Sequence, residues 1–260
     1  MTGPGGLEAV HRVGRPLWMD EFHRWSLSHW ICLMLAAIVL WSTISLARRL
    51  RDRHSPLERT LRTALGIGLL LFGMGYWAYF LRPSHFDWAW SLPLQLCDML
   101  VGVSAFSLLL NSRWLTTVTV FWGLAFASIA YVHPIVRVGP AHAHFWFFWV
   151  GHLVITLAVL YHLLVCRYRP TLKDLLLISA IGAVYGVAIT PINLWLEANY
   201  GFLGNTPPGE VPPIDAFGPW PQRLVLLWAL HQVLMVAIWA ALSRRSPLPS
   251  ALTLPVDSAR

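Results

Sequence analysis

Charged residues are scarce in this chain: they make up 12% of its 260 residues, whereas hydrophobic residues make up 57%. Soluble domains carry about twice that share of charge, so the composition excludes an ordinary water-soluble fold. Cysteine is scarce too, and three residues do not make a disulfide framework. Residues 1–24 are polar and no A-x-A-like motif follows the first apolar stretch, so we expect no cleavable signal peptide.

Seven long apolar runs occupy most of the remaining sequence. At ~20 residues each, such runs can cross ~30 Å of hydrocarbon as helices. They are too long and too uniformly apolar for barrel strands, although threonines dilute the fourth run. The sequence therefore predicts an all-α, polytopic membrane helix bundle with seven transmembrane helices, at residues 26–47, 61–81, 92–110, 114–132, 144–165, 175–196 and 223–241.

Lys and Arg are distributed unevenly between the connections of these runs. If the N-terminus lies outside, the cytoplasmic side carries 13 of the 19 basic residues and the outer side carries 6. Cytoplasmic loops are enriched in Lys and Arg, so we expect the N-out, C-in orientation. The same bias accounts for the net charge of +7, which requires no nucleic-acid partner. We divide the chain into an N-terminal tail (1–24), a transmembrane domain (25–243) and a C-terminal tail expected to be disordered (244–260).

In this topology the polar residues gather at one level of the bundle. Nine of the eleven histidines fall on the outer side or in the outer half of the runs. Cys97, Asp98, Asn193 and Asn199 lie at the same level. Ionisable groups in hydrocarbon are costly and are usually functional, so this level is the expected position of a site.

A thiol and an imidazole at this level suggest chemistry. Gln95, Cys97 and Asp98 stand at the mouth of the third run, and Pro93 favours a helix start about two turns before Cys97. His152 in the fifth run has a similar expected depth, so we predict that Cys97 and His152 approach within ~6 Å. Such a pair is the minimum for nucleophilic acyl transfer, and Asp98 could orient the imidazole. The alternative for both residues is simple core packing.

Other polar residues are weaker candidates. His29 and His231 fit interhelical hydrogen bonds better than catalysis. Asn199, Tyr200 and Asp215 lie in a long, proline-rich outer connection, which we expect to form a packed cap over the bundle. No Cys/His spacing matches a known metal box, so we expect neither a metal nor another cofactor.

Five ordered motifs point to a known family. The chain resembles the YwaF-like integral membrane proteins, which are bacterial relatives of vertebrate transmembrane protein 164. Relatives usually have His where this chain has Gln95. The vertebrate branch is understood as a lipid acyltransferase that uses a cysteine and a histidine, and the resemblance implies that Cys97 and His152 match them. The motifs are Ser28-His29-Trp30, Leu92 to Asp98, Gly151-His152, Asn199-Tyr200 and Asp215 to Pro221.

The combined prediction is a lipid acyltransferase of the cell membrane, specifically a phospholipid transacylase, with its site near the outer leaflet. Cys97 would carry an acyl thioester, His152 would be general base and then general acid, and Asp98 and Asn199 would orient these groups or the headgroup. Membrane phospholipids would donate the acyl chain and a lysolipid would accept it, because acyl-CoA is cytoplasmic. Two alternatives stay open. One is a lipid hydrolase that uses water as acceptor. The other is a non-catalytic transporter or receptor, for which broken helices are expected and Thr190-Pro191 is a candidate break.

Overall fold

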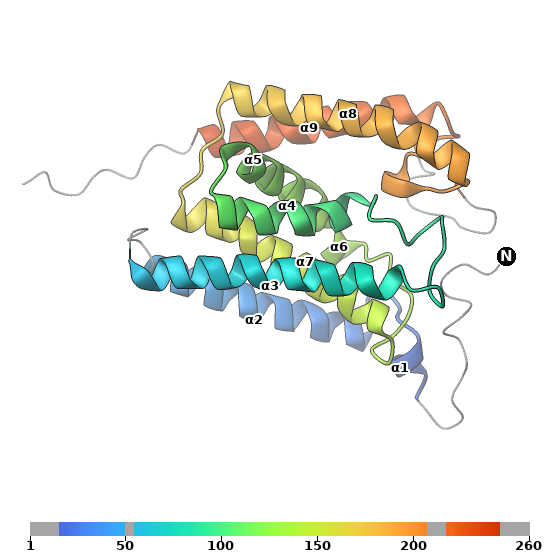
Figure 1. Cartoon of the computed structure of the whole chain (residues 1–260), viewed down its shortest axis with the longest axis horizontal. Helices are drawn as coiled ribbons and strands as arrows, with labels where there is room; N and C mark the ends of the chain where they lie inside the picture. Colours follow the sequence, from blue (N-terminus) through green and yellow to red (C-terminus); the bar gives the residue numbers. More distant parts are fainter. Residues whose placement is uncertain (1–15, 50–54, 207–216, 245–260) are drawn as a thin grey trace, which may run out of the picture.

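The computed structural model describes residues 16–49, 55–206 and 217–244, and in these residues the chain is helical, with one isolated bridge between Glu21 and Val138 (Figure 1). The predicted all-α class is confirmed. Asp215 and residues 245–260 lie outside the described part of the chain. The helices are α1 (Leu17–Asp20), α2 (Leu27–Arg49), α3 (Pro56–Phe80), α4 (Leu96–Leu110), α5 (Arg113–Trp122), the π-helical η1 (Gly123–Ala127), α6 (Ile129–Val132), α7 (Ala143–Leu160), the π-helical η2 (Tyr161–Val165), α8 (Leu172–Leu196), the 3-10 turn η3 (Tyr200–Phe202) and α9 (Arg223–Ser243).

The helices have the length and the surface of membrane spans. In the described residues, six stretches are long and apolar enough to cross a membrane, and α4 is a shorter apolar helix. Their outer faces expose large apolar side chains such as Trp41, Val225 and Trp195, which water would not accommodate but lipid does. The chain is therefore a multi-pass membrane protein. The six stretches are Leu27–Ala47, Pro56–Phe80, Arg113–Val132, Ala143–Val165, Leu172–Leu196 and Arg223–Ser243.

The fourth predicted span is the most deeply buried of the six. It comprises α5, η1 and α6, and Val120 and Phe121 on it are fully inaccessible. Thr117 and Thr119, which dilute the apolar character of this run, are fully buried as well. A helix surrounded by other helices does not face lipid, so it can carry hydroxyl groups, and the Thr117 hydroxyl bonds to Arg113 O and Asp174. The threonines therefore mark a central position in the bundle.

The third predicted span begins later than expected, which is a correction to the sequence analysis. The helix starts at Leu96, and Gln95 before it is extended, so Cys97 lies in the first turn of α4 and not two turns inside a helix. The residues before Leu96 are held in another conformation by contacts with distant segments. Leu92 N–H donates to the Tyr200 hydroxyl at 3.1 Å, and the Tyr185 hydroxyl donates to Leu94 O at 2.9 Å.

The late start makes α4 a short helix. Its 15 residues rise ~22 Å at ~1.5 Å per residue, which is less than the ~30 Å of a hydrocarbon core. Figure 1 shows the irregular chain that leads from the end of α3 into α4. The first turn of α4, with Cys97 and Asp98, is therefore set below the ends of the longer helices, inside the bundle.

The bundle has two distinct ends (Figure 1). We call one the α1 end; it holds α1 and the connections 81–95, 133–142 and 197–206. The other, the Asp174 end, holds the connections 110–113 and 166–171. The described chain starts at the α1 end and stops at the Asp174 end, as an odd number of crossings requires. Which end faces the outside stays a prediction from the basic residues.

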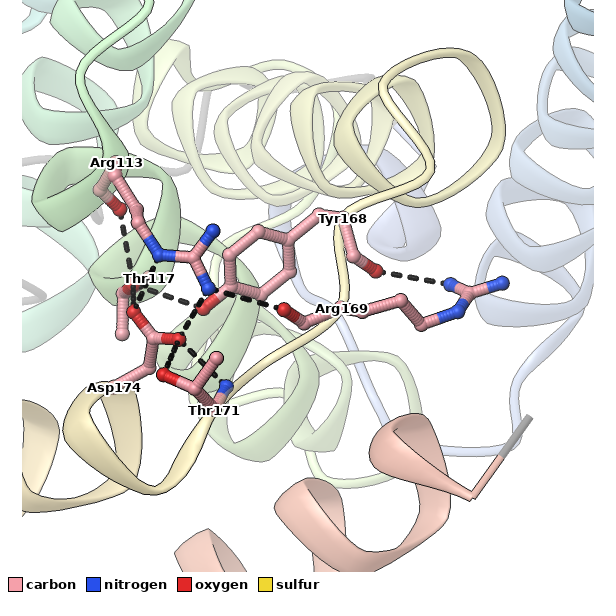
Figure 2. A network of polar contacts seen from close by, with 6 residues as sticks. All are labelled: Arg113, Thr117, Tyr168, Arg169, Thr171 and Asp174. Atoms are coloured by element: carbon pink, nitrogen blue, oxygen red, sulfur yellow. Dashed lines mark hydrogen bonds and ion pairs between the residues drawn. The ribbon is translucent and has the colours of Figure 1, made fainter. Parts of the chain in front are cut away.

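The Asp174 end is fixed by a polar network (Figure 2). Arg113 donates to both carboxylate oxygens of Asp174, at 3.1 and 2.6 Å, and to Arg169 O. Thr117 Oγ1 lies 2.8 Å from the Tyr168 hydroxyl and donates to Asp174 at 3.1 Å. Burial raises the pKa of Tyr168 to about 12, so its hydroxyl keeps its proton and can donate to Thr117. The network ties α5 to the start of α8.

Candidate active site

A large cavity lies between the helices. Its volume is about 1470 Å³, and its walls come from α3, α4, α7, α8, α9 and the α5–α6 stretch. Most of the lining is apolar or aromatic, with Trp122, Phe126 and Leu227 as examples. Volumes of this size hold a drug-sized or lipid-sized molecule, and such a wall suits hydrocarbon. The predicted residues that line it are Gln95, Cys97, Asp98, His152 and His231.

The start of α4 presents Cys97 and Asp98 to this cavity. They are the second and third residues of the helix, and both are partly accessible because they face the hollow. Among the described residues, no group accepts a hydrogen bond from the backbone N–H of Leu96, Cys97 or Asp98. Free N–H groups at a helix start form a positive end that stabilises a thiolate or a developing oxyanion. The thiol thus stands beside donors that acyl-transfer chemistry requires.

Contacts from the α1 end hold this helix start in place. The Gln95 side chain accepts from Gly201 N–H at 2.9 Å, and the Tyr200 hydroxyl donates to Trp88 O at 2.8 Å. Tyr200 is itself fixed, because its backbone N–H and O pair with the amide of Asn193 at 2.8 and 2.9 Å. Burial raises the pKa of Tyr200 to about 12, so the phenol remains a donor. The segment around Tyr200 therefore braces the entry into α4.

Asp98 has a tyrosine beside it and no cation. The Tyr76 hydroxyl, from α3, approaches its carboxylate, and Tyr185 of α8 lies within electrostatic range of Cys97 and Asp98. Among the described residues, no Lys, Arg or His forms an ion pair with Asp98. Neither tyrosine was singled out in the sequence. Both lie within predicted spans at about the expected depth of Cys97, and that position is the feature of the sequence that could have indicated them.

His152 also faces the cavity, from α7. It is buried, and its Nδ1 lies 2.7 Å from Phe148 O. A carbonyl only accepts, so Nδ1 carries the proton and Nε2 has an available lone pair. Among the described residues, none hydrogen-bonds to Nε2. The Phe148 carbonyl therefore holds the ring in the tautomer that a general base needs, a role that a carboxylate fills in other catalytic sites.

Cys97 and His152 line one cavity but are not bonded to each other. Helices α4 and α7 pack together, and no hydrogen bond joins the thiol to the imidazole in the described residues. Catalytic hydrogen bonds often tighten only when substrate is bound. The expected separation within ~6 Å stays a prediction.

His29 and His231 differ in their surroundings. His29 is fully buried, with Nδ1 2.9 Å from Trp25 N and Nε2 3.0 Å from Tyr131 O, so it ties α2 to α6 and does not line the cavity. His231 lines the cavity on α9, between the stacked rings of Phe126 and Trp228. It therefore contributes to an aromatic part of the cavity wall.

The remaining predicted residues belong to the connection that braces α4. Asn199 accepts from Gly204 N–H at 3.0 Å within its own loop, and neither Asn199 nor Tyr200 lines the cavity. Trp220 donates to Leu203 O at 3.1 Å, so the two ends of this connection are bonded to each other; a cap over the bundle stays a prediction. Asp215 lies outside the described residues, so its position is not assigned. Within those residues, no group of three or more His, Cys, Asp or Glu side chains could hold a metal ion.

Comparison with known proteins identifies a family. No curated protein and no solved structure matches the chain significantly. A model of the TMEM164 family matches residues 24–243, which includes every described helix of the bundle from α2 to α9. The match contains the cavity with Cys97 and His152, and it agrees with the resemblance given by the five sequence motifs. The chain belongs to the TMEM164 family.

Proposed function

We propose that this protein is a lipid acyltransferase, specifically a phospholipid transacylase of the cell membrane that uses Cys97 and His152. The observation that carries the proposal is their joint position on one lipid-sized cavity, with His152 held in the tautomer of a base. Cys97 adds a nucleophile at a helix start with free N–H groups. The two residues are the ones that family resemblance pairs with an acyltransferase site.

In the first half-reaction, His152 Nε2 takes the thiol proton and Cys97 Sγ attacks the ester carbonyl of a phospholipid. The backbone N–H groups of Cys97 and Asp98 stabilise the oxyanion of the tetrahedral intermediate. The ester C–O bond then breaks, and the lysophospholipid oxygen leaves with the proton held by His152. The products are an acyl thioester on Cys97 and a free lysophospholipid.

In the second half-reaction, a lysolipid acceptor occupies the same cavity. His152 takes the proton of its hydroxyl, and the oxygen attacks the thioester carbonyl. The C–S bond breaks and Cys97 leaves as a thiolate that regains the proton from His152. Asp98 and Tyr76 lie beside the thiol and orient it or the acceptor. Apolar cavity walls around these groups limit the entry of water, which favours transfer over hydrolysis.

A transporter has less support. Helix α8 continues through Pro191 without a break from Leu172 to Leu196, so the expected discontinuity at Thr190-Pro191 is absent from this helix. Membrane helices tolerate proline when neighbouring groups satisfy the backbone. An unbroken helix removes the feature that would have indicated a substrate site of the transporter type.

The test is a search for the acyl intermediate. The purified protein is incubated in vesicles of phospholipid with a labelled acyl chain, quenched in acid, and measured by intact mass. We expect an adduct of one acyl chain that maps to Cys97, is released by hydroxylamine, and is missing from Cys97→Ser but present in Cys166→Ser. An adduct that persists in Cys97→Ser would refute the assignment.

Product analysis separates transfer from hydrolysis. With a lysophospholipid acceptor present, we expect labelled diacyl phospholipid as the main product. Release of labelled free fatty acid at the same rate, whether or not the acceptor is present, would identify a hydrolase with the same residues.

A further inference from the structure

The wall of the cavity changes from apolar to basic at the α1 end. Arg24, which precedes α2, and Arg137, in the connection after α6, line the cavity together with His133. All three side chains are exposed at the surface. None of these residues takes part in the acyl-transfer steps. We call Arg24, His133 and Arg137 the basic rim of the cavity. A basic rim beside an apolar cavity suits a ligand that has both an anionic group and a hydrocarbon chain.

Backbone pairing fixes the position of this rim. Phe22 N–H donates to Arg137 O at 2.7 Å, and Gly139 N–H donates to Asp20 O at 2.9 Å. The two strands of chain lie so close that a Cβ on Gly139 would stand 2.5 Å from Met19 O. Backbone pairing thus brings Arg137 next to Phe22, two residues before Arg24, so that both arginines line the same end of the cavity although they are far apart in the sequence.

The nearby acidic groups are engaged elsewhere. Asp20 lies 3.4 Å from His142 Nε2, and Glu21 lies 3.3 Å from His23 Nε2. Among the described residues, no carboxylate forms an ion pair with Arg24 or Arg137. Arg24 Nη1 donates to His133 Nδ1 at 2.6 Å, which leaves the other guanidinium N–H groups for a ligand. The rim therefore carries two positive charges whose natural counter-ion is not supplied by the described chain.

We propose that Arg24, Arg137 and His133 form a binding site for the phosphate of a glycerophospholipid whose acyl chain lies in the cavity. The proposal rests on the proposed function and adds the position of the headgroup. Guanidinium groups form forked, charge-assisted hydrogen bonds with phosphate oxygens. The phosphate would stay at the α1 end while the glycerol and the ester extend toward Cys97. This arrangement orients the carbonyl for attack and selects lipids that carry a phosphate.

Binding to the inactive Cys97→Ser protein tests the site without turnover. Two probes share one oleoyl chain: lysophosphatidylglycerol carries the phosphate and monooleoylglycerol does not. We expect the lysophospholipid to bind at least ~10-fold more tightly, the usual worth of a charge-assisted hydrogen bond. Arg24→Gln combined with Arg137→Gln should remove this preference and leave the affinity for monooleoylglycerol unchanged. The matched control is Arg82→Gln, since Arg82 is an exposed arginine of the same end that does not line the cavity.

Further arms identify the source of the phosphate and guard against misfolding. Glycerol 3-phosphate alone should compete weakly, because it lacks the acyl chain; competition as strong as that of the lysophospholipid would assign the site to a free phosphate and overturn the proposal. Arg137→Lys retains the charge and should keep part of the preference. A double Gln variant that still prefers the lysophospholipid would also overturn it. Since Cys97 is not needed for binding, a missing acyl adduct alongside an intact phosphate preference would reject the reaction and leave the headgroup site standing.

Discussion

Two helices of this bundle carry an aspartate as the third residue of the first turn, and the two carboxylates have opposite surroundings. In α8, Asp174 accepts from the backbone N–H and the hydroxyl of Thr171, at 2.6 and 2.7 Å, and pairs with Arg113. In α4, Asp98 has neither a capping partner nor a cation among the described residues, and the side-chain oxygen of Gln95, at the cap position, accepts from Gly201 N–H instead. Asp98 faces a cavity instead.

The difference separates structural from functional polar groups. Buried polar groups are normally satisfied, and the Asp174 end follows that rule in every contact of its network (Figure 2). At the start of α4, the Cys97 thiol and three backbone N–H groups lack such partners among the described residues, and the Asp98 carboxylate has the Tyr76 hydroxyl but no cation. Proteins break local rules at functional sites and compensate elsewhere. We therefore expect substitutions at the Asp174 end to change stability, and substitutions around Cys97 to change activity.

The largest effect should follow Cys97→Ser. Serine is nearly isosteric but has a much higher pKa, and an imidazole suited to a thiol activates it poorly. We expect acyl transfer between phospholipids in reconstituted vesicles to fall to background, with an unchanged melting temperature. Cys166→Ser, at the opposite end of the bundle, should retain transfer. Undiminished transfer by a protein that lacks both thiols would show that Cys97 only packs.

His152→Ala should have the next largest effect. Removal of a general base typically lowers a rate by roughly 10²–10⁴. We expect this loss in the rate constant for adduct formation on Cys97, measured by rapid acid quench. His29→Ala is the matched control, because His29 is buried near the same end but does not line the cavity. His29→Ala should lower stability and leave the rate of correctly folded protein nearly unchanged; the reverse pattern would exchange the two assignments.

Asp174→Asn should weaken the fold and leave the chemistry intact. The amide cannot accept from Thr171 and Arg113 as the carboxylate does, so we expect a loss of about 2 kcal/mol in the free energy of unfolding. The ion pair supplies little of this, because the Arg113 side chain is 57% exposed. Denaturant unfolding in detergent measures the change, and transfer activity per folded protein should stay constant.

Asp98→Asn is the direct counterpart and sharpens the comparison. Asp98 accepts no hydrogen bond from the residue that caps α4. Replacing its carboxylate with a neutral amide should therefore leave the free energy of unfolding unchanged or raise it, while the rate of transfer falls. Equal destabilisation by Asp98→Asn and Asp174→Asn would remove the distinction between the two ends.

The sequence predicted much of the architecture and only part of the site. Hydrophobic runs set the class and six of the helices within a few residues, because lipid demands long apolar segments. The predicted start of α4 was wrong, because the conformation of the residues before Leu96 depends on contacts from Tyr200 and Tyr185, more than 80 residues away in the chain. The common level of Cys97 and His152 stays a prediction from helix length. The tyrosine beside Asp98 and the arginines of the rim could not be predicted, because they depend on which helix faces meet.

The smallest effect should follow Tyr200→Phe, which tests whether the contacts of Tyr200 position Cys97. The substitution removes one hydroxyl that donates to Trp88 O and accepts from Leu92 N–H, and it leaves the ring and its packing in place. Loss of these hydrogen bonds should cost about 1 kcal/mol of stability. Because the same contacts hold the entry into α4, the position of Cys97 should become less well defined, and transfer should fall by several-fold. Tyr168→Phe is the matched control, since Tyr168 loses one hydroxyl contact, to Thr117, at the Asp174 end. It should lower stability to a similar extent without slowing transfer. If both variants slow transfer equally, the connection at the α1 end acts on the fold as a whole and has no separate part in placing the thiol.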